Sequence, residues 1–247
     1  MTESQLLILQ DAQTHVTDLL SHKLSKDIRF HSLQHTQEVV AACEKLAESI
    51  QLPDDDRFAL AIAAWFHDTG YTGGKAKDHE TVSMQLASGF LAAHSATEDL
   101  KNKVTGCINA TRIPQSPRNI MEQIICDADL FHLGTDSFKE KSRLLREELE
   151  EFGKKRKEIS KKDWRKINIR FLEGHTYFTA YGKEKLQPAK EIHLAGLKQK
   201  DKNNDEMKPD KKEKDKQKDN DEMKPDKKEK DKQKEKEKGK MAMTPEA

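Results

Sequence analysis

An uncharged run of eight residues, Leu60 to His67, is followed at once by Asp68, Thr69 and Gly70. Such a run predicts a helix buried in the centre of the domain, with a carboxylate at the point where the helix stops. A buried carboxylate is costly unless it is ion-paired or coordinates a metal. Because neighbouring helical residues point about 100° apart, an ion lodged between them is within reach of both side chains. We therefore expect His67 and Asp68 to share one metal ion.

The remaining body of the chain repeats the helical spacing of apolar residues, without a convincing run of alternating strand residues. The predicted fold class is therefore all-α, a compact multi-helix bundle. The first helix is expected to pack over the core as a lid, and the glycine-rich residues 71–78 are expected to form a mobile loop over Asp68. Helices are expected at residues 3–24, 39–50, 53–67, 79–90, 104–110, 120–130, 138–152 and 164–172.

The C-terminal part of the chain differs in composition from the rest. Between Lys198 and Lys240 there are 18 lysines and 14 acidic residues, a net charge of +4 within a chain of net charge +1, so the rest carries −3. The segment 204–218 recurs unchanged at 220–234. With almost no apolar residues it cannot offset the entropy of ordering. We expect a helical domain over residues 1–197 and a disordered tail over 198–247 that makes at most weak electrostatic contacts.

Charge and cysteine usage limit the possible partners and compartments. The nearly balanced charge gives no reason to expect specific nucleic-acid binding. Three distant cysteines, Cys43, Cys107 and Cys126, form no CxxC pair, and are interpreted as core thiols of a protein in a reducing compartment. We find no signal-peptide pattern and no apolar stretch long enough to span a bilayer. A soluble, cytoplasmic protein is expected.

Several potential metal ligands occur near the ends of predicted helices. They are His35, the pair His67 and Asp68, and a distant aspartate, either Asp127 or Asp129. Imidazole and carboxylate groups together suit a hard or borderline divalent ion. His31 precedes His35 by four residues, so the two share one face if the helix has already begun at His31. The residues alone leave the choice between Asp127 and Asp129 open.

The order of these groups, with the adjacent His-Asp pair in the middle, resembles the HD-domain metal-dependent phosphohydrolases, in particular the predicted HD-superfamily phosphohydrolase branch. The resemblance covers about residues 25–195. It is carried by the following stretches: Phe30-His31 to His35-Thr36, Phe66-His67-Asp68-Thr69-Gly70-Tyr71-Thr72, His79-Glu80 with Ser83, Thr111-Arg112-Ile113-Pro114, Cys126-Asp127-Ala128-Asp129-Leu130 with Leu133-Gly134, Leu144 to Leu149, and Phe171-Leu172-Glu173 with Tyr177-Phe178-Thr179.

The resemblance implies a metal site made by His35, His67, Asp68 and Asp129, because family members place the ligand five residues before the glycine that is Gly134 here. Asp127 would then support the site from behind the ligands. The family's two-metal subgroup has two further histidines. His79 matches the first, but Ala110 stands where the second is expected, just before Thr111. One divalent ion (Mn, Mg, Fe, Co, Ni or Zn) is expected, with a second held only weakly.

The activity implied is metal-assisted hydrolysis of a small phosphate monoester or diester, with a nucleotide as the expected substrate class. Asp68, His31 and Glu80 are the expected catalytic residues, Asp68 orienting a water and the other two transferring or positioning protons. The expected phosphate-binding residues are Lys75, Lys77, Arg112, Arg143 and Arg146. The alternative is a catalytically weak or inactive module that senses nucleotides or acts as a scaffold.

Overall fold

The computed structural model describes residues 1–74, 77–152 and 158–206. Its elements are α1 (Glu3–Lys23), α2 (Leu33–Ser49), α3 (Asp54–Phe66), the short helix η1 (Thr69–Gly73), α4 (His79–Ala93), α5 (Glu98–Ala110), α6 (Ile120–Asp129), η2 (Phe131–Gly134), α7 (Phe138–Phe152), α8 (Lys161–Gly174), η3 (Gly182–Leu186) and α9 (Gln187–Glu206). The described residues contain no strand, so the predicted all-α fold class is confirmed.

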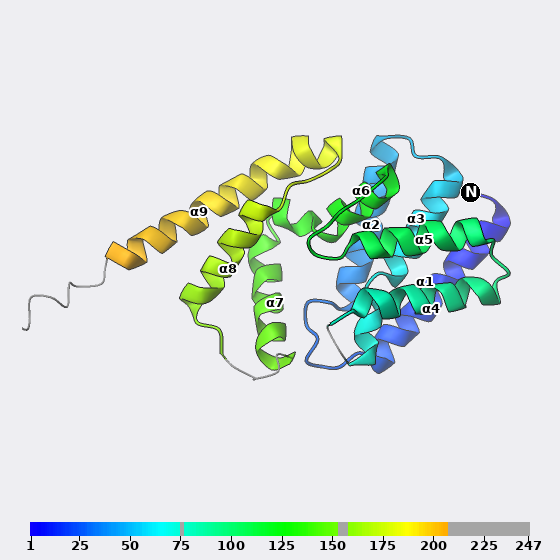
Figure 1. Cartoon of the computed structure of the whole chain (residues 1–247), viewed down its shortest axis with the longest axis horizontal. Helices are drawn as coiled ribbons and strands as arrows, with labels where there is room; N and C mark the ends of the chain where they lie inside the picture. Colours follow the sequence, from blue (N-terminus) through cyan, green and yellow to red (C-terminus); the bar gives the residue numbers. More distant parts are fainter. Residues whose placement is uncertain (75–76, 153–157, 207–247) are drawn as a thin grey trace, which may run out of the picture. The chain divides into compact units, whose positions relative to one another are not determined.

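Helix α3 lies at the centre of the domain, as its uncharged sequence predicts. Eight of its residues are buried, and α1, α2, α4, α5 and α6 all contact it (Figure 1). Its first turn holds Asp54, Asp55 and Asp56, and Pro53 precedes it. Proline fits the start of a helix, and acidic side chains complement the positive end of the helix dipole. Both ends of α3 are therefore set by its own sequence, and the C-terminal end delivers His67 and Asp68.

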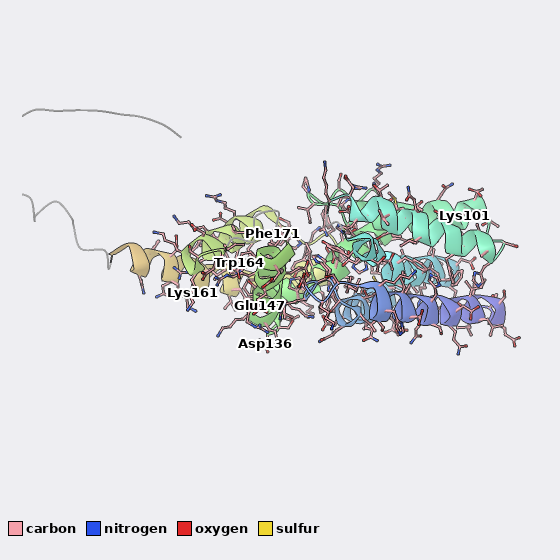
Figure 2. All side chains as sticks on the ribbon, turned by 90° about the horizontal axis from the view of Figure 1, so that it is seen from below. Lys101, Asp136, Glu147, Lys161, Trp164 and Phe171 are labelled. Atoms are coloured by element: carbon pink, nitrogen blue, oxygen red, sulfur yellow. The ribbon has the colours of Figure 1, made fainter. Side chains whose placement is uncertain are left out.

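A second, smaller core holds α7 and α8 beside the bundle. Leu130, Leu133 and Phe138 pack there with Leu172, Tyr177 and Leu186. Figure 1 shows α7 and α8 running in opposite directions, and Figure 2 marks Glu147 on α7 and Trp164 and Phe171 on α8. Ser160 caps α8 by accepting a hydrogen bond from the Asp163 amide at 3.0 Å, as the sequence predicts. These two helices form a wall near the end of α6.

Helix α9 continues past residue 198, where the tail is expected to begin. Its end is tied to α8, because Arg165 donates a hydrogen bond to the carbonyl oxygen of Lys200 at 2.9 Å and lies 3.5 Å from the carboxylate of Asp201. Composition alone does not reveal such contacts, which offset part of the ordering entropy. Residues 198–206 are thus helical, and the remainder of the expected tail, 207–247, lies outside the described residues.

The structure changes the expectation for the segment after Asp68 and agrees with the expectation for the cysteines. Residues 69–73 form η1 rather than an open loop, and Tyr71 is only 5% exposed. Cys43, Cys107 and Cys126 are buried and unpaired, as expected for core thiols. Within the described residues, no helix has the length and apolar character needed to cross a membrane.

Candidate metal centre and substrate cavity

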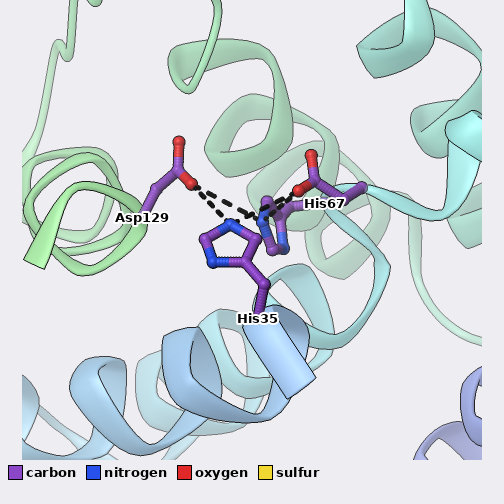
Figure 3. Close-up of side chains that lie close together, drawn as sticks. His35, His67 and Asp129 are labelled. Carbon is purple, nitrogen blue, oxygen red and sulfur yellow. Dashed lines mark hydrogen bonds and ion pairs between the residues drawn. The ribbon is translucent and has the colours of Figure 1, made fainter. Parts of the chain in front are cut away.

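Four side chains from the ends of three helices converge at one end of the bundle, and Figure 3 labels three of them, His35, His67 and Asp129. His35 comes from the first turn of α2, His67 and Asp68 follow α3, and Asp129 is the last residue of α6. One potential ligand atom from each lies within 4.8 Å of every other. Nε2 of His35 is 3.1 Å from Oδ1 of Asp129, and Nε2 of His67 is 3.1 Å from Oδ2 of Asp68. The structure therefore brings all four sequence-predicted ligands together.

The orientation of His67 is fixed by the backbone. Its Nδ1 donates a hydrogen bond to the carbonyl oxygen of Ala64 at 2.8 Å, one turn back in α3. The other ring nitrogen, Nε2, therefore points into the cluster. Holding one imidazole nitrogen in this way is how proteins orient histidines that ligate a metal through the other.

Two polar atoms of the cluster lack hydrogen-bond partners. Nε2 of His67 and Oδ2 of Asp68 are buried and form no hydrogen bond, although they lie 3.1 Å apart. Buried polar atoms are seldom left in this state because it costs about 1–3 kcal/mol each. Atoms that point side by side at a common position suit a shared cation, and the imidazole and carboxylate donors fit a divalent ion.

The charges of the cluster also favour a cation. Burial alone raises the pKa of Asp68, but the neighbouring His67 and the contact with His79 outweigh burial and hold it well below its ordinary value. The pKa of Asp129 is likewise lowered, because contact with His35 and the charge of His67 outweigh burial. Burial lowers the pKa of His67, yet the two aspartates prevail and raise it to about 9. The two carboxylates thus stay ionised and hold a proton on His67, and a metal ion bound at Nε2 of His67 would replace that proton.

His31 lies beside the cluster but outside the helix. Helix α2 begins at Leu33 with Ser32 as its cap, so His31 precedes it and does not share its face with His35 as an i, i+4 pair. Nδ1 of His31 contacts Oε1 of Glu148 at 2.5 Å, and Nε2 contacts the hydroxyl of Tyr71 at 3.1 Å. The ring of Tyr71 stacks on that of His31 at 4.1 Å. His31 is therefore held on both nitrogens and on one face.

Glu148 on α7 organises the turn that carries His31. Its Oε2 accepts hydrogen bonds from the backbone amides of Arg29, Phe30 and His31 at 2.8–3.1 Å. Burial by itself raises the pKa of Glu148, but these bonds and the contact with His31 outweigh it and lower the pKa. Burial also raises the pKa of Tyr71, so its hydroxyl stays protonated where it contacts Nε2 of His31. Sequence reasoning missed both residues, since neither has ligand spacing.

Glu80 and Arg112 lie at the rim of the cluster. Glu80 is buried, and its Oε2 is 3.7 Å from Nδ1 of His79 and 3.5 Å from Nη1 of Arg112. Nε2 of His79 is in turn 3.3 Å from Oδ1 of Asp68. The structure therefore connects Glu80 to the cluster through His79, while Arg112 is oriented by Glu80 and is about one third exposed.

None of the other predicted phosphate-binding residues that the structure describes is brought to the cluster. Lys77 is exposed, and Lys75 lies outside the described residues. Arg143 pairs with Glu140 and Glu147 on the outer face of α7. Arg146 donates to Glu150 at 2.9 Å and to the carbonyl oxygen of Ile159. Both arginines border a separate groove formed with α8 and α9.

Asp127 and Asp129 serve different parts of the fold. Two positions along a helix rotate the side chain by about 200°, so the two aspartates point in nearly opposite directions. Asp127 is fully buried and accepts hydrogen bonds from the amides of Phe178 and Thr179 at 2.8 Å and from the Thr179 hydroxyl at 2.7 Å. The expected supporting position for Asp127 behind the ligands is not observed; the residue fixes the segment leading into η3.

A cavity of about 220 Å³ opens next to the cluster. Its polar side is formed by Asp68, Asp129, His31, His79 and Glu80. Burial lowers the pKa of His132, which also lines it, to about 3, so that imidazole is neutral. The opposite side is formed by residues of α7 and α8. The lining residues, which belong to the part of the chain that the structure describes, are Phe30, His31, Asp68, Tyr71, His79, Glu80, Thr111, Ile113, Asp129, Leu130, His132, Leu133, Phe138, Ser142, Leu145, Asn168 and Phe171.

The helical fold and the His/His/Asp/Asp centre define a class of helical proteins with a buried cluster that could hold a divalent metal ion. Residues 32–134 match the family model of the HD domain. This segment is therefore an HD domain, the domain that defines the HD metal-dependent phosphohydrolase superfamily. No curated protein and no solved structure matches the chain. The matched segment contains all four residues of the cluster and ends at Gly134, before α7 begins.

Proposed function

We propose that this protein is a metal-dependent hydrolase of phosphate esters, with nucleotides as its substrate class. HD domains bind divalent metals, and the His/His/Asp/Asp cluster fits a metal-dependent hydrolase. The observation that carries the proposal is the convergence of His35, His67, Asp68 and Asp129, with two buried atoms lacking hydrogen bonds, at the wall of a cavity. These four residues would hold one cation.

The lining of the cavity explains why phosphate binding would depend on the cation. Within the described residues, three carboxylates line the cavity, from Asp68, Asp129 and Glu80, and no lysine or arginine does. An anionic substrate would be repelled by this lining alone. A bound divalent cation offsets this charge, withdraws electrons from the phosphoryl group and makes a water more acidic.

His31 is the chain's best-placed group for proton transfer in this proposal. It lines the cavity, and Glu148 and Tyr71 fix both ring nitrogens, so its orientation is set before a substrate arrives. Asp68, a ligand that also faces the cavity, would orient the water. Glu80 would position His79 and Arg112, and Arg112 at the rim would add a phosphate contact.

A second hollow, of about 400 Å³, reaches His35 and Asp129 from another side, between α2 and the residues following α6. Its lining lacks Asp68, His31 and Glu80. We therefore assign the substrate to the 220 Å³ cavity, where two of the proposed metal ligands, Asp68 and Asp129, lie beside the proton-transfer groups.

The proposal is tested with the full chain supplied with Mn²⁺, Mg²⁺, Co²⁺ or Ni²⁺ in turn. We expect release of phosphate from p-nitrophenyl phosphate or from members of a panel of nucleoside phosphates. Asp68→Asn should remove this release, while Asp136→Asn, an exposed aspartate between η2 and α7, should retain it. Release that persists at the wild-type rate in Asp68→Asn would contradict the proposal. Binding of metal and nucleotide without turnover would instead indicate the sensing module.

A further inference from the structure

The cavity is only partly built by the HD domain. Its remaining wall comes from Phe138, Ser142 and Leu145 of α7 and from Asn168 and Phe171 of α8, all beyond the matched segment. Most of this wall is apolar. Ser142 and Asn168 are its polar members, which gives the wall one defined place for hydrogen bonding.

Ser142 and Asn168 are held in place by a small network. The hydroxyl of Ser142 donates to Oδ1 of Asn168 at 2.9 Å and accepts from the indole Nε1 of Trp164 at 3.0 Å. Nδ2 of Asn168 donates to the carbonyl oxygen of Trp164 at 2.8 Å. A side chain fixed by such a network is pre-organised, so little further ordering is needed when it binds a ligand.

These bonds leave part of the hydrogen-bonding capacity of Asn168 unused. A primary amide has two N–H donors and two acceptor positions on its oxygen, and the network uses one of each. One donor and one acceptor therefore remain on the same planar group. An amide of this kind pairs with the donor and acceptor edge of a nucleobase, as Asn and Gln do with adenine.

From this arrangement we infer that Asn168 and Ser142 form a nucleobase subsite that selects nucleoside monophosphates as the substrates of the proposed metal site. Phe138, Leu145 and Phe171 supply apolar contact for the face of the base. The volume of about 220 Å³ lies below the 300–1,000 Å³ usual for pockets that hold drug-sized ligands, which favours a single nucleotide over a dinucleotide or a polymer. The inference rests on the proposed function only for the position of the substrate's phosphate group, and the contacts to the nucleobase do not depend on it.

The test compares two substrates in each variant. Asn168→Leu removes the amide and keeps the same branching of heavy atoms, and Ile167→Ala, at an exposed residue next to it on α8, is the control. We expect Asn168→Leu to lower kcat/KM for nucleoside monophosphates about 10- to 100-fold, the effect of losing two hydrogen bonds. The value for p-nitrophenyl phosphate, which has no nucleobase edge, should change less than about twofold by the same reasoning. Ser142→Ala should act in the same direction, and Ile167→Ala should match the wild type.

A binding measurement separates failure of the subsite from failure of the catalytic proposal. Adenosine, guanosine, cytidine and uridine are titrated calorimetrically into metal-free protein, because nucleosides need no cation. At least one should bind, and Asn168→Leu should weaken it about 10-fold or more. Equal losses for both phosphate substrates, or nucleoside binding that Asn168→Leu leaves unchanged, would overturn the subsite. If the wild type hydrolyses no phosphate ester, the nucleoside titration alone tests the subsite. Absence of nucleoside binding to the wild type would also overturn the subsite.

Discussion

Nε2 of His67 and Oδ2 of Asp68 lie 3.1 Å apart in the interior of the protein, and neither atom forms a hydrogen bond. The two residues are neighbours in the chain, at the point where the apolar helix α3 ends. Their atoms are directed at a common position that His35 and Asp129 also approach. The end of one buried helix thus sets half of the proposed metal site, and α2 and α6 supply the rest.

Gly70 is required by the close approach of η1 to α4. A Cβ at this position would lie 1.9 Å from the carbonyl oxygen of His79. Gly70→Ala should lower the free energy of unfolding by at least about 3 kcal/mol, because backbone atoms cannot move aside cheaply. Gly73→Ala, where a Cβ meets nothing within 4 Å, is the control and should change stability little. Urea unfolding curves measure both, and equal stabilities would show that the contact is not as close as described.

Asp127→Asn should affect stability rather than metal binding. Its carboxylate accepts three hydrogen bonds near η3, and an amide nitrogen in place of one oxygen would face donors. We expect a loss of about 1–3 kcal/mol in thermal or urea unfolding. The Mn²⁺ content should equal that of the wild type. Loss of the metal from a variant that is still folded would place Asp127 in the site, against this account.

Glu148→Gln should disturb the orientation of His31. The variant replaces one of the two oxygens that bind three backbone amides and the ring of His31. We expect a loss of about 1–3 kcal/mol of stability and a lower kcat for phosphate ester hydrolysis with a smaller change in KM. Glu147→Gln, the adjacent and more exposed glutamate, serves as the control. An unchanged kcat in Glu148→Gln would exclude the positioning role.

His175 should contribute to the acid sensitivity of the fold. Burial, with the charge of the buried Lys190, lowers its pKa from 6.5 to about 4. As pH falls from 6.5 to 4, the unfolded chain takes up a proton at His175 that the folded protein does not, so stability decreases over this range by up to about 3 kcal/mol. His175→Gln removes this proton uptake. Its unfolding free energy should therefore fall less steeply between pH 6.5 and 4, whereas parallel profiles would assign the sensitivity to other groups.

Much of the fold could be predicted because its signals are local. The uncharged run of α3, the prolines and the capping residues mark helix positions through propensity and spacing. The start of α8 after Ser160 is one such case, and the bounds of α7 another. The end of the helical body was harder to predict, since α9 is extended to Glu206 by contacts of Arg165 that composition does not encode.

The candidate site was predictable where it depends on sequence motifs and not where it depends on packing. The four residues of the cluster follow from their order in the chain and the family pattern. Tyr71 lies within the His-Asp motif, but nothing in the motif shows its contact with His31, and Glu148 could not be found in this way because it lies 117 positions from His31 and shows only the spacing of an amphipathic helix. Arg143 and Arg146 were expected near phosphate because they are cationic hydrogen-bond donors on a predicted helix, but they border a different groove, formed with α8 and α9.

The central claim is that His35, His67, Asp68 and Asp129 hold one divalent cation, and its most direct test is calorimetric titration of metal-free protein with Mn²⁺. We expect one ion per chain. Loss of a group that only hydrogen-bonds a metal ligand lowers metal affinity about 10- to 100-fold, and Asp129→Asn, which removes a ligand, should lower the Mn²⁺ affinity by more than this. Asp136→Asn, an exposed aspartate seven residues on, should bind as the wild type does. Undiminished Mn²⁺ affinity in a folded Asp129→Asn variant would contradict the account.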